Sequence, residues 1–439
     1  MRKYESVGVA VSGVLLPREG IAPEKWAVVA CDQYTSQPEY WKNAMGFVGD
    51  SPSTLNLILP EVYLETPREE ELVSEVNRNM KKYLEENILV KQKPGFVLVD
   101  RKTSKASSRK GLVVGLDLEQ YDFREGSKTL IRATEGTLVD RLPPRIKVRK
   151  DAPIELPHIM VLIDDPDKTI IEPLFDMDLE KIYDFELMMQ SGHIKGYRID
   201  NENTINTIAE KLAQLSDPET FNQKYNVENQ AVLLYAMGDG NHSFATAKAI
   251  WEELKKSGQS TEEIMSHPAR YALVELVNLH DDGLEFEPIH RVVFNVDTKD
   301  MFEKMDAFYS AQGSELSIKK VESEPETENA HVVSFVTGNE TGALIIKNPK
   351  LILEVATLQS FLDSYLENNK QAKLDYVHGK EVVSELGSKP GNVGFFLEPM
   401  SKHALFKTII LDGALPQKTF SMGEADEKRF YLECRKITD

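Results

Sequence analysis

Residues 231–248 read Ala231-Val-Leu-Leu-Tyr-Ala-Met-Gly238-Asp239-Gly240-Asn241-His242-Ser243-Phe-Ala-Thr-Ala-Lys248, an apolar run followed by a Gly-Asp-Gly turn and an alanine-rich segment. The apolar run is typical of a buried strand. The segment that begins at Ser243 predicts a helix, because alanine has the highest helix propensity. The glycines on either side of Asp239 permit backbone conformations that other residues resist, and they let a ligand approach the main chain. The stretch therefore predicts a strand that passes through a tight turn into a helix.

The start of this predicted helix is a candidate binding site for an anion. The first N–H groups of a helix have no partner within it, and the helix dipole adds partial positive charge there. We therefore expect a phosphate cradle with side-chain donors, formed by Gly238, Gly240, Asn241, His242 and Ser243. Asp239 is expected to hold a magnesium ion or to take a proton. An ordinary Asp-Gly turn followed by a serine cap is the alternative interpretation of these residues.

The rest of the chain favours an α+β fold with mixed sheets and interspersed helices. A capping pattern at Thr66–Glu69, followed by apolar residues at three- and four-residue steps, predicts a helix that reaches Ile88. Apolar runs at 95–99 and 111–116 flank a solvated Ser- and Lys-rich stretch and predict a hairpin. Further strands are expected at 159–163, 231–236, 271–278, 290–296, 331–336 and 430–434, and helices at 204–215, 243–256, 300–312, 358–367 and 401–411. Because strands and helices do not alternate regularly, a doubly wound sheet is not expected.

The length of the chain indicates more than one structural unit. A single hydrophobic core stops growing at about 250–300 residues, and the sequence has 439. We expect a main α+β domain over residues 1–296, which carries the Gly-Asp-Gly turn, and a C-terminal α/β region over residues 297–439. A charged stretch at 322–329 is expected to be a connector.

Composition and charge exclude several classes of function. Hydrophobic residues make up 41% and charged residues 28% of the sequence, which is typical of a folded chain. The formal net charge of −19 repels phosphate backbones and anionic lipid, so we expect a small-molecule substrate and neither nucleic acid nor membrane as a partner. Cys31 and Cys434 form no disulfide framework, and no apolar run is long enough to span a bilayer. A cytoplasmic protein is therefore expected, and an oligomer is possible.

The common nucleotide and metal motifs do not occur in the sequence. Neither the Walker pattern nor the dinucleotide fingerprint is found, and no histidine or cysteine pair has a zinc-binding spacing. The phosphate cradle is therefore the strongest candidate site.

Several blocks of the sequence resemble the DUF1015 family of uncharacterised proteins. Asp239–Ser243 is similar to the family's Asp-Gly-His-His-Arg signature, and a related signature occurs in free-serine kinases of the ParB/sulfiredoxin-like superfamily. In this chain Asn241 replaces the first histidine and Ser243 replaces the arginine, which removes a bidentate phosphate clamp. The other similar blocks follow in the same order as in the family and are Arg132–Thr137 with Asp140 and Arg141, Asn278–Arg291, and Leu415–Phe420. Cys31–Tyr34 stands where the family usually has Pro-Tyr-Asp-Val.

The resemblance implies a small-molecule phosphotransferase with a ParB/sulfiredoxin-like core and large additions. The acceptor is expected to be free serine or a similar hydroxyl-bearing metabolite, and the donor ATP, ADP or pyrophosphate, with Mg²⁺ held by Asp239. A phosphatase or nucleotide hydrolase with the same cradle, and a non-catalytic ParB-like nucleotide-binding protein, are the alternatives.

Roles for individual residues follow from the same resemblance. His242 is expected to donate to the transferred group, and Glu135 or Asp32 to accept the acceptor's hydroxyl proton. Because the signature arginine is missing, other basic groups are expected to bind phosphate, namely Arg132, Arg141, His290, Arg291 and Lys418.

Overall fold

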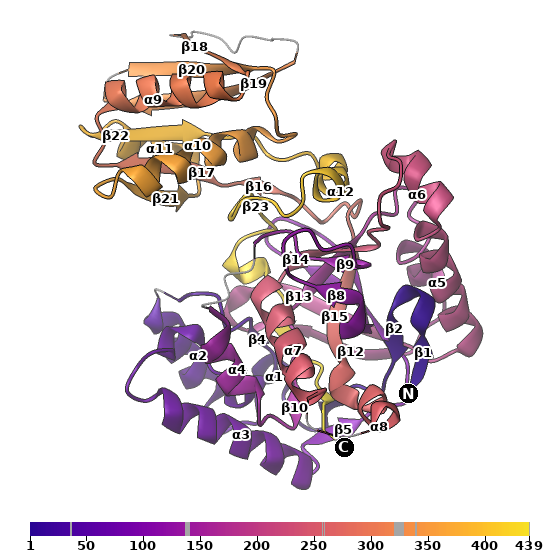
Figure 1. Cartoon of the computed structure of the whole chain (residues 1–439). Coiled ribbons are helices and arrows are strands. Elements are labelled where there is room, and N and C mark those ends of the chain that lie inside the picture. The colour runs from indigo at the N-terminus through magenta and orange to yellow at the C-terminus, as the bar shows by residue number, and fades with distance from the viewer. Residues whose placement is uncertain are drawn as a thin grey trace. The chain divides into compact units, whose positions relative to one another are not determined.

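The computed structural model describes residues 1–35, 37–136, 141–256, 258, 260–319, 329–338 and 340–438. The chain folds into two compact units (Figure 1). Unit 1 comprises Met1–Glu285 and Met422–Asp439, and unit 2 comprises Phe286–Ser421. Unit 2 is therefore inserted between the body of unit 1 and its C-terminal segment. The expected division between 296 and 297 differs from these limits, because 286–296 belongs to unit 2 and 422–439 returns to unit 1. Of the expected connector, 322–328 lies outside the described residues.

Unit 1 is built on an eleven-stranded mixed sheet. The main order is β12-β13-β6-β7-β15-β11-β14-β9-β8, and β2 joins β1 to the end of β7. β11 runs parallel to β15, and β9 runs parallel to β14 and β8, while the other pairs are antiparallel. The strands are β1 (Arg2–Tyr4), β2 (Val9–Val11), β6 (Phe96–Lys102), β7 (Arg109–Asp117), β8 (Tyr121–Asp122), β9 (Ile131–Arg132), β11 (Met160–Ile163), β12 (Lys181–Glu186), β13 (His193–Ile199), β14 (Tyr235–Asp239) and β15 (Tyr271–Asn278). The expected α+β class is confirmed.

Both faces of this sheet are buried. Because successive side chains of a strand point to opposite faces, β6 sends Phe96 and Leu98 into one core and Val97 and Val99 into the other. The first core contains residues of α5 (Glu202–Leu215) and α7 (Asn241–Leu254), and the second contains residues of α2 (Pro38–Val48) and α3 (Glu69–Glu85). Polar groups that could act on a ligand must therefore gather at strand ends and helix ends.

The shorter helices of unit 1 are α1 (Pro23–Trp26), α4 (Leu142–Arg149), α6 (Pro218–Tyr225) and α8 (Thr261–Ser266). No helix within the described ranges combines the length and the apolar character that crossing a bilayer demands.

Helix α3 begins later than the sequence pattern predicted. Its N-cap is Arg68, and the expected capping box at Thr66 and Glu69 is wrong. Thr66 Oγ1 donates to the Tyr63 carbonyl at 2.7 Å, and Glu69 Oε2 accepts from the Glu65 N–H at 2.6 Å, so both side chains are used in the preceding turn. The expected apolar stripe is confirmed, with buried side chains at Val73, Val76, Met80 and Tyr83.

The expected hairpin is formed by β6 and β7. Its tip is exposed at Ser104, Lys105 and Ser107, as expected for a solvated loop, but the two ends of the loop contact the C-terminal segment. Thr103 Oγ1 donates to Glu427 Oε1 at 2.6 Å, and Arg109 Nη1 donates to the Glu427 carbonyl at 3.0 Å. Thr103 and Arg109 are both buried.

The strand-turn-helix junction is formed by β14 and α7, as the sequence predicted, although the strand begins at Tyr235 rather than Ala231. Gly240 has a φ of 80°, and a Cβ atom there would lie 3.0 Å from Ile159 Cγ1, so the turn requires glycine. A Cβ atom on Gly238 would lie 2.7 Å from Met422 Cε. The two glycines are therefore explained by the turn geometry and by close packing.

Unit 2 contains a six-stranded antiparallel sheet with the order β18-β20-β19-β22-β17-β21. Its strands are β16 (Glu287–Pro288), β17 (His290–Phe294), β18 (Glu315–Lys319), β19 (Ala330–Thr337), β20 (Glu340–Lys347), β21 (Lys373–Val377), β22 (Asn392–Phe396) and β23 (Phe420–Ser421), of which β16 and β23 form a separate pair. Its helices are α9 (Thr298–Ala311), α10 (Glu354–Asn368), α11 (Lys380–Gly387) and α12 (Lys402–Leu411). Each strand and helix that the sequence predicted in this unit is present, with shifted ends.

The C-terminal segment of unit 1 is fixed by strand pairs and buried charges. β24 (Phe430–Tyr431) pairs with β4 (Val28–Val29), and β25 (Arg435–Lys436) pairs with β10 (Ile154–Glu155). Arg429 forms buried ion pairs with Glu275 and Glu433. Removing one partner of a buried pair is strongly destabilising, so the pair with Glu275 of β15 fixes the segment in one position. The segment thereby places Lys428 and Tyr431 in the interior of unit 1.

Candidate functional site

Charged groups from two distant parts of the chain meet at the start of α7. Gly240 is the N-cap of α7, and no described side chain caps the helix. Asp239 Oδ1 accepts a hydrogen bond from the Gly240 N–H at 2.8 Å, and Asp239 Oδ2 lies 3.2 Å from Lys428 Nζ. The start of the helix and the Lys428 ammonium therefore place positive charge beside the Asp239 carboxylate.

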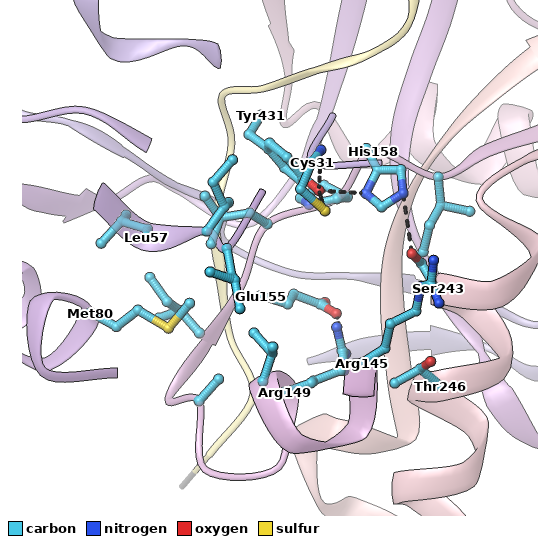
Figure 2. Close-up of a pocket in the computed structure, with 18 of the residues that line it drawn as sticks. Cys31, Leu57, Met80, Arg145, Arg149, Glu155, His158, Ser243, Thr246 and Tyr431 are labelled. Atoms are coloured by element: carbon cyan, nitrogen blue, oxygen red, sulfur yellow. Dashed lines mark hydrogen bonds and ion pairs between the residues drawn. The ribbon is translucent and has the colours of Figure 1, made fainter. Parts of the chain in front are cut away.

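His158 connects the start of α7 to two other segments. Its Nε2 lies 3.1 Å from Ser243 Oγ, and its Nδ1 lies 2.8 Å from the Tyr431 hydroxyl (Figure 2). The same Nε2 lies 3.8 Å from Asp32 Oδ2. His158 is buried, whereas 28% of the Asp32 side chain is exposed. The Ser243 hydroxyl, on the first turn of α7, and the accessible Asp32 carboxylate thus approach the same nitrogen of the His158 imidazole.

Residues 132–136 of the next block lie beside the cradle, because β9 pairs with β14. The Thr134 N–H donates to Asn241 Oδ1 at 3.3 Å, and Asn241 Nδ2 lies 3.3 Å from Thr134 Oγ1. Arg132 itself donates to the backbone carbonyls of Thr129, Ala231 and Val232. Because the guanidinium of Arg132 already donates to these carbonyls, its contacts do not support the expected phosphate-binding role.

The contacts of the other expected residues in this block do not assign them a role. Glu135 is half-buried in the segment that follows β9, while Thr137 and Asp140 lie outside the described residues. Glu135 stays a predicted proton acceptor.

Arg145, rather than Arg141, lies near the cluster formed by His158, Asp32, Ser243 and Tyr431, because Arg145 and His158 line the same cavity. Arg141 is exposed, and its backbone carbonyl accepts from Arg145 Nη1 at 2.7 Å. Arg145 forms an ion pair with Glu61, whose N–H donates to the Cys31 carbonyl at 2.8 Å. Arg141 is the N-cap of α4 and is exposed, whereas Arg145 lies within the helix, four residues later.

Burial and charge shift the pKa values of three groups in this cluster. Although burial alone would raise it, the charges of Lys428 and His158 hold the pKa of the Asp239 carboxyl below its usual value. Burial raises the pKa of Glu61 despite the nearby Arg145 guanidinium. Burial, together with Asp32 and Glu61, raises the pKa of the Cys31 thiol far above its usual value. Cys31 is therefore a protonated thiol and not a nucleophile at neutral pH.

The remaining expected phosphate-binding residues belong to unit 2. Arg291 is buried and donates to Gln359 Oε1, the Ile289 carbonyl and the Gln417 carbonyl at 2.8, 2.6 and 3.1 Å. His290 Nδ1 accepts from the Leu397 N–H at 3.0 Å, and Lys418 has a positive φ of 55° in the loop before β23. These contacts of His290 and Arg291 are internal to unit 2 and do not support binding of phosphate.

The expected magnesium site at Asp239 does not fit the groups around it. Both carboxylate oxygens of Asp239 already have partners, Lys428 and the Gly240 N–H. A group of three His, Cys, Asp or Glu side chains suited to a metal does not occur in the described ranges. A lysine ammonium within contact distance opposes a cation at the same carboxylate, so we assign no metal to this site.

An apolar cavity of about 130 Å³ lies next to this cluster (Figure 2). Ser243 and Thr246 of α7 and His158 line one part of it, and Leu57 and Met80 lie on the opposite side. Ser243 and Thr246 are three residues apart in a helix and share one face, so the cavity extends from the cradle along the first turn of α7.

Three residues of the cluster were not expected from the sequence. His158 and Tyr431 belong to no motif, and Lys428 lies far from the Gly-Asp-Gly turn in the sequence. Of the residues around His158, Asp32 was expected from the sequence, because it belongs to the Cys31–Tyr34 block.

Comparison with known proteins places the chain in a family. No curated protein matches it. The chain is similar to the structure of a conserved hypothetical protein from Pyrococcus furiosus, with 14% identity over 74% of this chain and 95% of that chain, and a TM-score of 0.35. It is also similar to a free serine kinase in complex with AMP, with 13% identity over 74% and 91% of the two chains, and a TM-score of 0.37. For SbnI with a C-terminal truncation from Staphylococcus aureus, the identity is 8% over 74% and 87%, and the TM-score is 0.38.

The expected ParB/sulfiredoxin-like core stays a prediction.

The sequence profile described as "Protein of unknown function (DUF1015)" matches residues 15–365, well over half of the chain, and the protein therefore belongs to the DUF1015 family.

Proposed function

We propose that this protein is a small-molecule phosphotransferase. It binds a phosphate-bearing donor (ATP, ADP or pyrophosphate) at the start of α7 and transfers a phosphoryl group to a hydroxyl-bearing acceptor, such as free serine. The observation that carries this proposal is the convergence of an uncapped helix start, Lys428 and the Asp32–His158–Ser243 cluster within unit 1.

Phosphoryl transfer needs alignment and neutralisation of charge more than covalent help from the protein. The backbone N–H groups of Asn241, His242 and Ser243 stand at the positive end of the α7 dipole and hold the donor's phosphates. Lys428 supplies the cation that the missing signature arginine would have supplied. Asp239 positions Lys428, and His242 donates to the transferred group.

The acceptor hydroxyl requires a group that takes its proton. Its oxygen attacks the terminal phosphorus, the bond from phosphorus to the leaving oxygen breaks, and that oxygen keeps the electron pair. The hydroxyl proton passes to Asp32, which is accessible and lies beside His158. Glu135 is the alternative acceptor of this proton.

Replacing Lys428 by Met tests the binding of the donor. A hydrogen bond to a charged group contributes about 1.5–3 kcal/mol, so AMP, ADP and pyrophosphate should bind about 10- to 100-fold more weakly to Lys428→Met in isothermal titration calorimetry. The matched control is Lys150→Met, which removes an exposed ion pair with Glu253 (3.0 Å) and should leave binding unchanged. Equal binding by Lys428→Met and the unaltered protein would contradict the proposal.

Phosphorus NMR identifies the reaction. Serine, ADP and AMP are named with the similar free serine kinase structures, so they are among the first compounds to test. Incubation with serine and ATP, ADP or pyrophosphate should yield phosphoserine. Inorganic phosphate without phosphoserine, or its release from phosphoserine alone, would instead indicate a phosphatase or nucleotide hydrolase. Tight nucleotide binding without turnover, with a change of oligomeric state, would indicate a nucleotide-sensing protein.

A further inference from the structure

The apolar cavity beside α7 differs in chemistry from the cradle that it adjoins. Its wall is formed largely by aliphatic side chains, including Leu57, Leu59, Met80, Val148 and Ala152. Its volume of about 130 Å³ approaches the ~150 Å³ of an engineered apolar cavity that takes up benzene. The cavity is therefore large enough for a group of about six carbon atoms.

The charged residues that line the cavity already neutralise one another. Glu61 forms an ion pair with Arg145, and Glu155 Oε2 pairs with Arg149 Nη2 at 2.6 Å. Glu155 Oε1 also accepts from Arg435 Nε at 2.6 Å and from the Leu273 N–H at 2.9 Å. A charged group of a ligand would have to break one of these pairs and leave a buried charge uncompensated, which is costly. The lining therefore selects an uncharged group.

Polar atoms at the cradle end of the cavity set the orientation of such a ligand. Ser243 Oγ and His158 both line the cavity, and Asp32 Oδ2 lies 3.8 Å from His158 Nε2. Figure 2 shows Ser243 and His158 on one side of the cavity and Leu57 and Met80 on the other. A ligand that places its carbon chain between the aliphatic residues thus presents its hydroxyl to Ser243 and His158.

We propose that this cavity binds the acceptor of the reaction, and that the acceptor is an alcohol with an uncharged hydrocarbon or aromatic body of about six carbons. This inference rests on the proposed function and narrows its acceptor class. Free serine carries an ammonium and a carboxylate, and the cavity offers neither of them an available partner charge. Phosphoserine is therefore expected to form more slowly than the phosphate ester of an apolar alcohol.

A homologous series of primary alcohols from ethanol to octanol tests the cavity directly. Each buried methylene group contributes about 0.8 kcal/mol, so the affinity should rise about fourfold per carbon. The rise should stop near hexanol, when the cavity is full. Binding is measured by calorimetry or by competition with a fluorescent apolar alcohol on the full chain. Affinity that does not depend on chain length would overturn the proposal.

Two substitutions should shift this dependence in opposite directions. Ala152 is buried in the wall, so Ala152→Met should fill the cavity and weaken hexanol binding at least tenfold. Leu59→Ala should enlarge the cavity and move the best chain length up by about two carbons. Ala372→Met is the matched control, because Ala372 is also buried but lies in unit 2. A misfolded variant would lose binding at every chain length and would not produce the upward shift.

The outcomes for the cavity and for the proposed function are separable. The Lys428→Met variant should bind hexanol as the unaltered protein does, since Lys428 does not line the cavity. If hexanol binds but no donor phosphorylates any alcohol, the proposed function fails and the cavity assignment stands. If phosphoserine forms while alcohol binding ignores chain length, the cavity assignment fails. Displacement of hexanol by AMP would place a nucleobase in the cavity and would also overturn the assignment.

Discussion

The β14–α7 junction of unit 1 and the β17 strand of unit 2 both carry a histidine in a polar motif, but the structure uses them differently. At the junction, polar groups surround an uncapped helix start beside a cavity, and Asp32 is accessible. In β17, His290 and Arg291 are buried, and their hydrogen bonds run to neighbouring parts of unit 2. Buried polar groups with internal partners hold a fold together, whereas polar groups beside an accessible cavity can exchange partners with a ligand.

The largest difference between the two regions should appear in turnover. Asp32→Asn keeps the shape of the side chain but removes the proton acceptor, so the rate of phosphoryl transfer should fall about 10²- to 10⁴-fold while ADP binding is retained. Phosphorus NMR measures the rate. Asp50→Asn, at an exposed position of unit 1, is the matched control and should be fully active. Retained activity in Asp32→Asn would transfer the role to Glu135.

A large loss of stability, confined to unit 2, is expected for Arg291→Met. The substitution leaves Gln359 and two backbone carbonyls without their donor, which should destabilise unit 2 by about 3 kcal/mol. Hydrogen exchange of the unit 2 strands measures this change. All three tryptophans (Trp26, Trp41 and Trp251) lie in unit 1, so their fluorescence reports whether unit 1 is unaffected.

ADP binding should be unchanged in Arg291→Met. Loss of ADP binding with normal hydrogen exchange would restore Arg291 to the phosphate-binding role that the family resemblance implied, and would break the contrast between the two regions.

The smallest expected effect is a pH dependence of unit 2. Burial lowers the pKa of His290, helped by the positive charge of Lys380, so the unfolded state takes up a proton at a higher pH than the folded state does. The stabilising contribution of neutral His290 is therefore complete above about pH 6.5 and is lost as the pH falls toward the lowered folded-state pKa.

His290→Asn keeps an acceptor for the Leu397 N–H but does not titrate, so hydrogen exchange in unit 2 should depend less on pH between 7.5 and about 5. His267→Asn is the matched control in unit 1, because His267 Nδ1 likewise accepts a backbone N–H, from Ala269, at 3.1 Å. An unchanged pH dependence in His290→Asn would show that another group, such as half-buried His331, dominates.

Local features of the junction were predictable because they depend on a few neighbouring residues. Gly240 was expected to permit an unusual backbone, and its φ is 80°. The alanine-rich segment forms α7, and the apolar run before it contains β14. The predicted capping box at Thr66 does not form, because the Thr66 side chain donates to the carbonyl of Tyr63, three residues earlier, and takes part in the preceding turn instead.

Which residues line the site was harder to predict from the sequence. Arg132, Arg141 and Arg145 lie within one short stretch, yet only Arg145 lines the cavity. Arg132 donates hydrogen bonds to backbone carbonyls that precede β14, and Arg141 is exposed at the residue before α4. Which guanidinium faces the cavity depends on the direction of α4 against the rest of unit 1, and no spacing in the sequence encodes that direction.

The sequence by itself determined the class of fold, the strand-turn-helix junction, the positive helix start and the family, because these depend on local backbone preferences and on the order of short motifs. Only the tertiary structure decided that Lys428, Tyr431 and His158 complete the site. In the sequence, unit 2 separates the C-terminal segment from the rest of unit 1, and the segment is fixed in unit 1 by buried pairs such as Arg429–Glu275. Such pairing is set by packing between distant segments, so its physical cause lies outside any local stretch of residues.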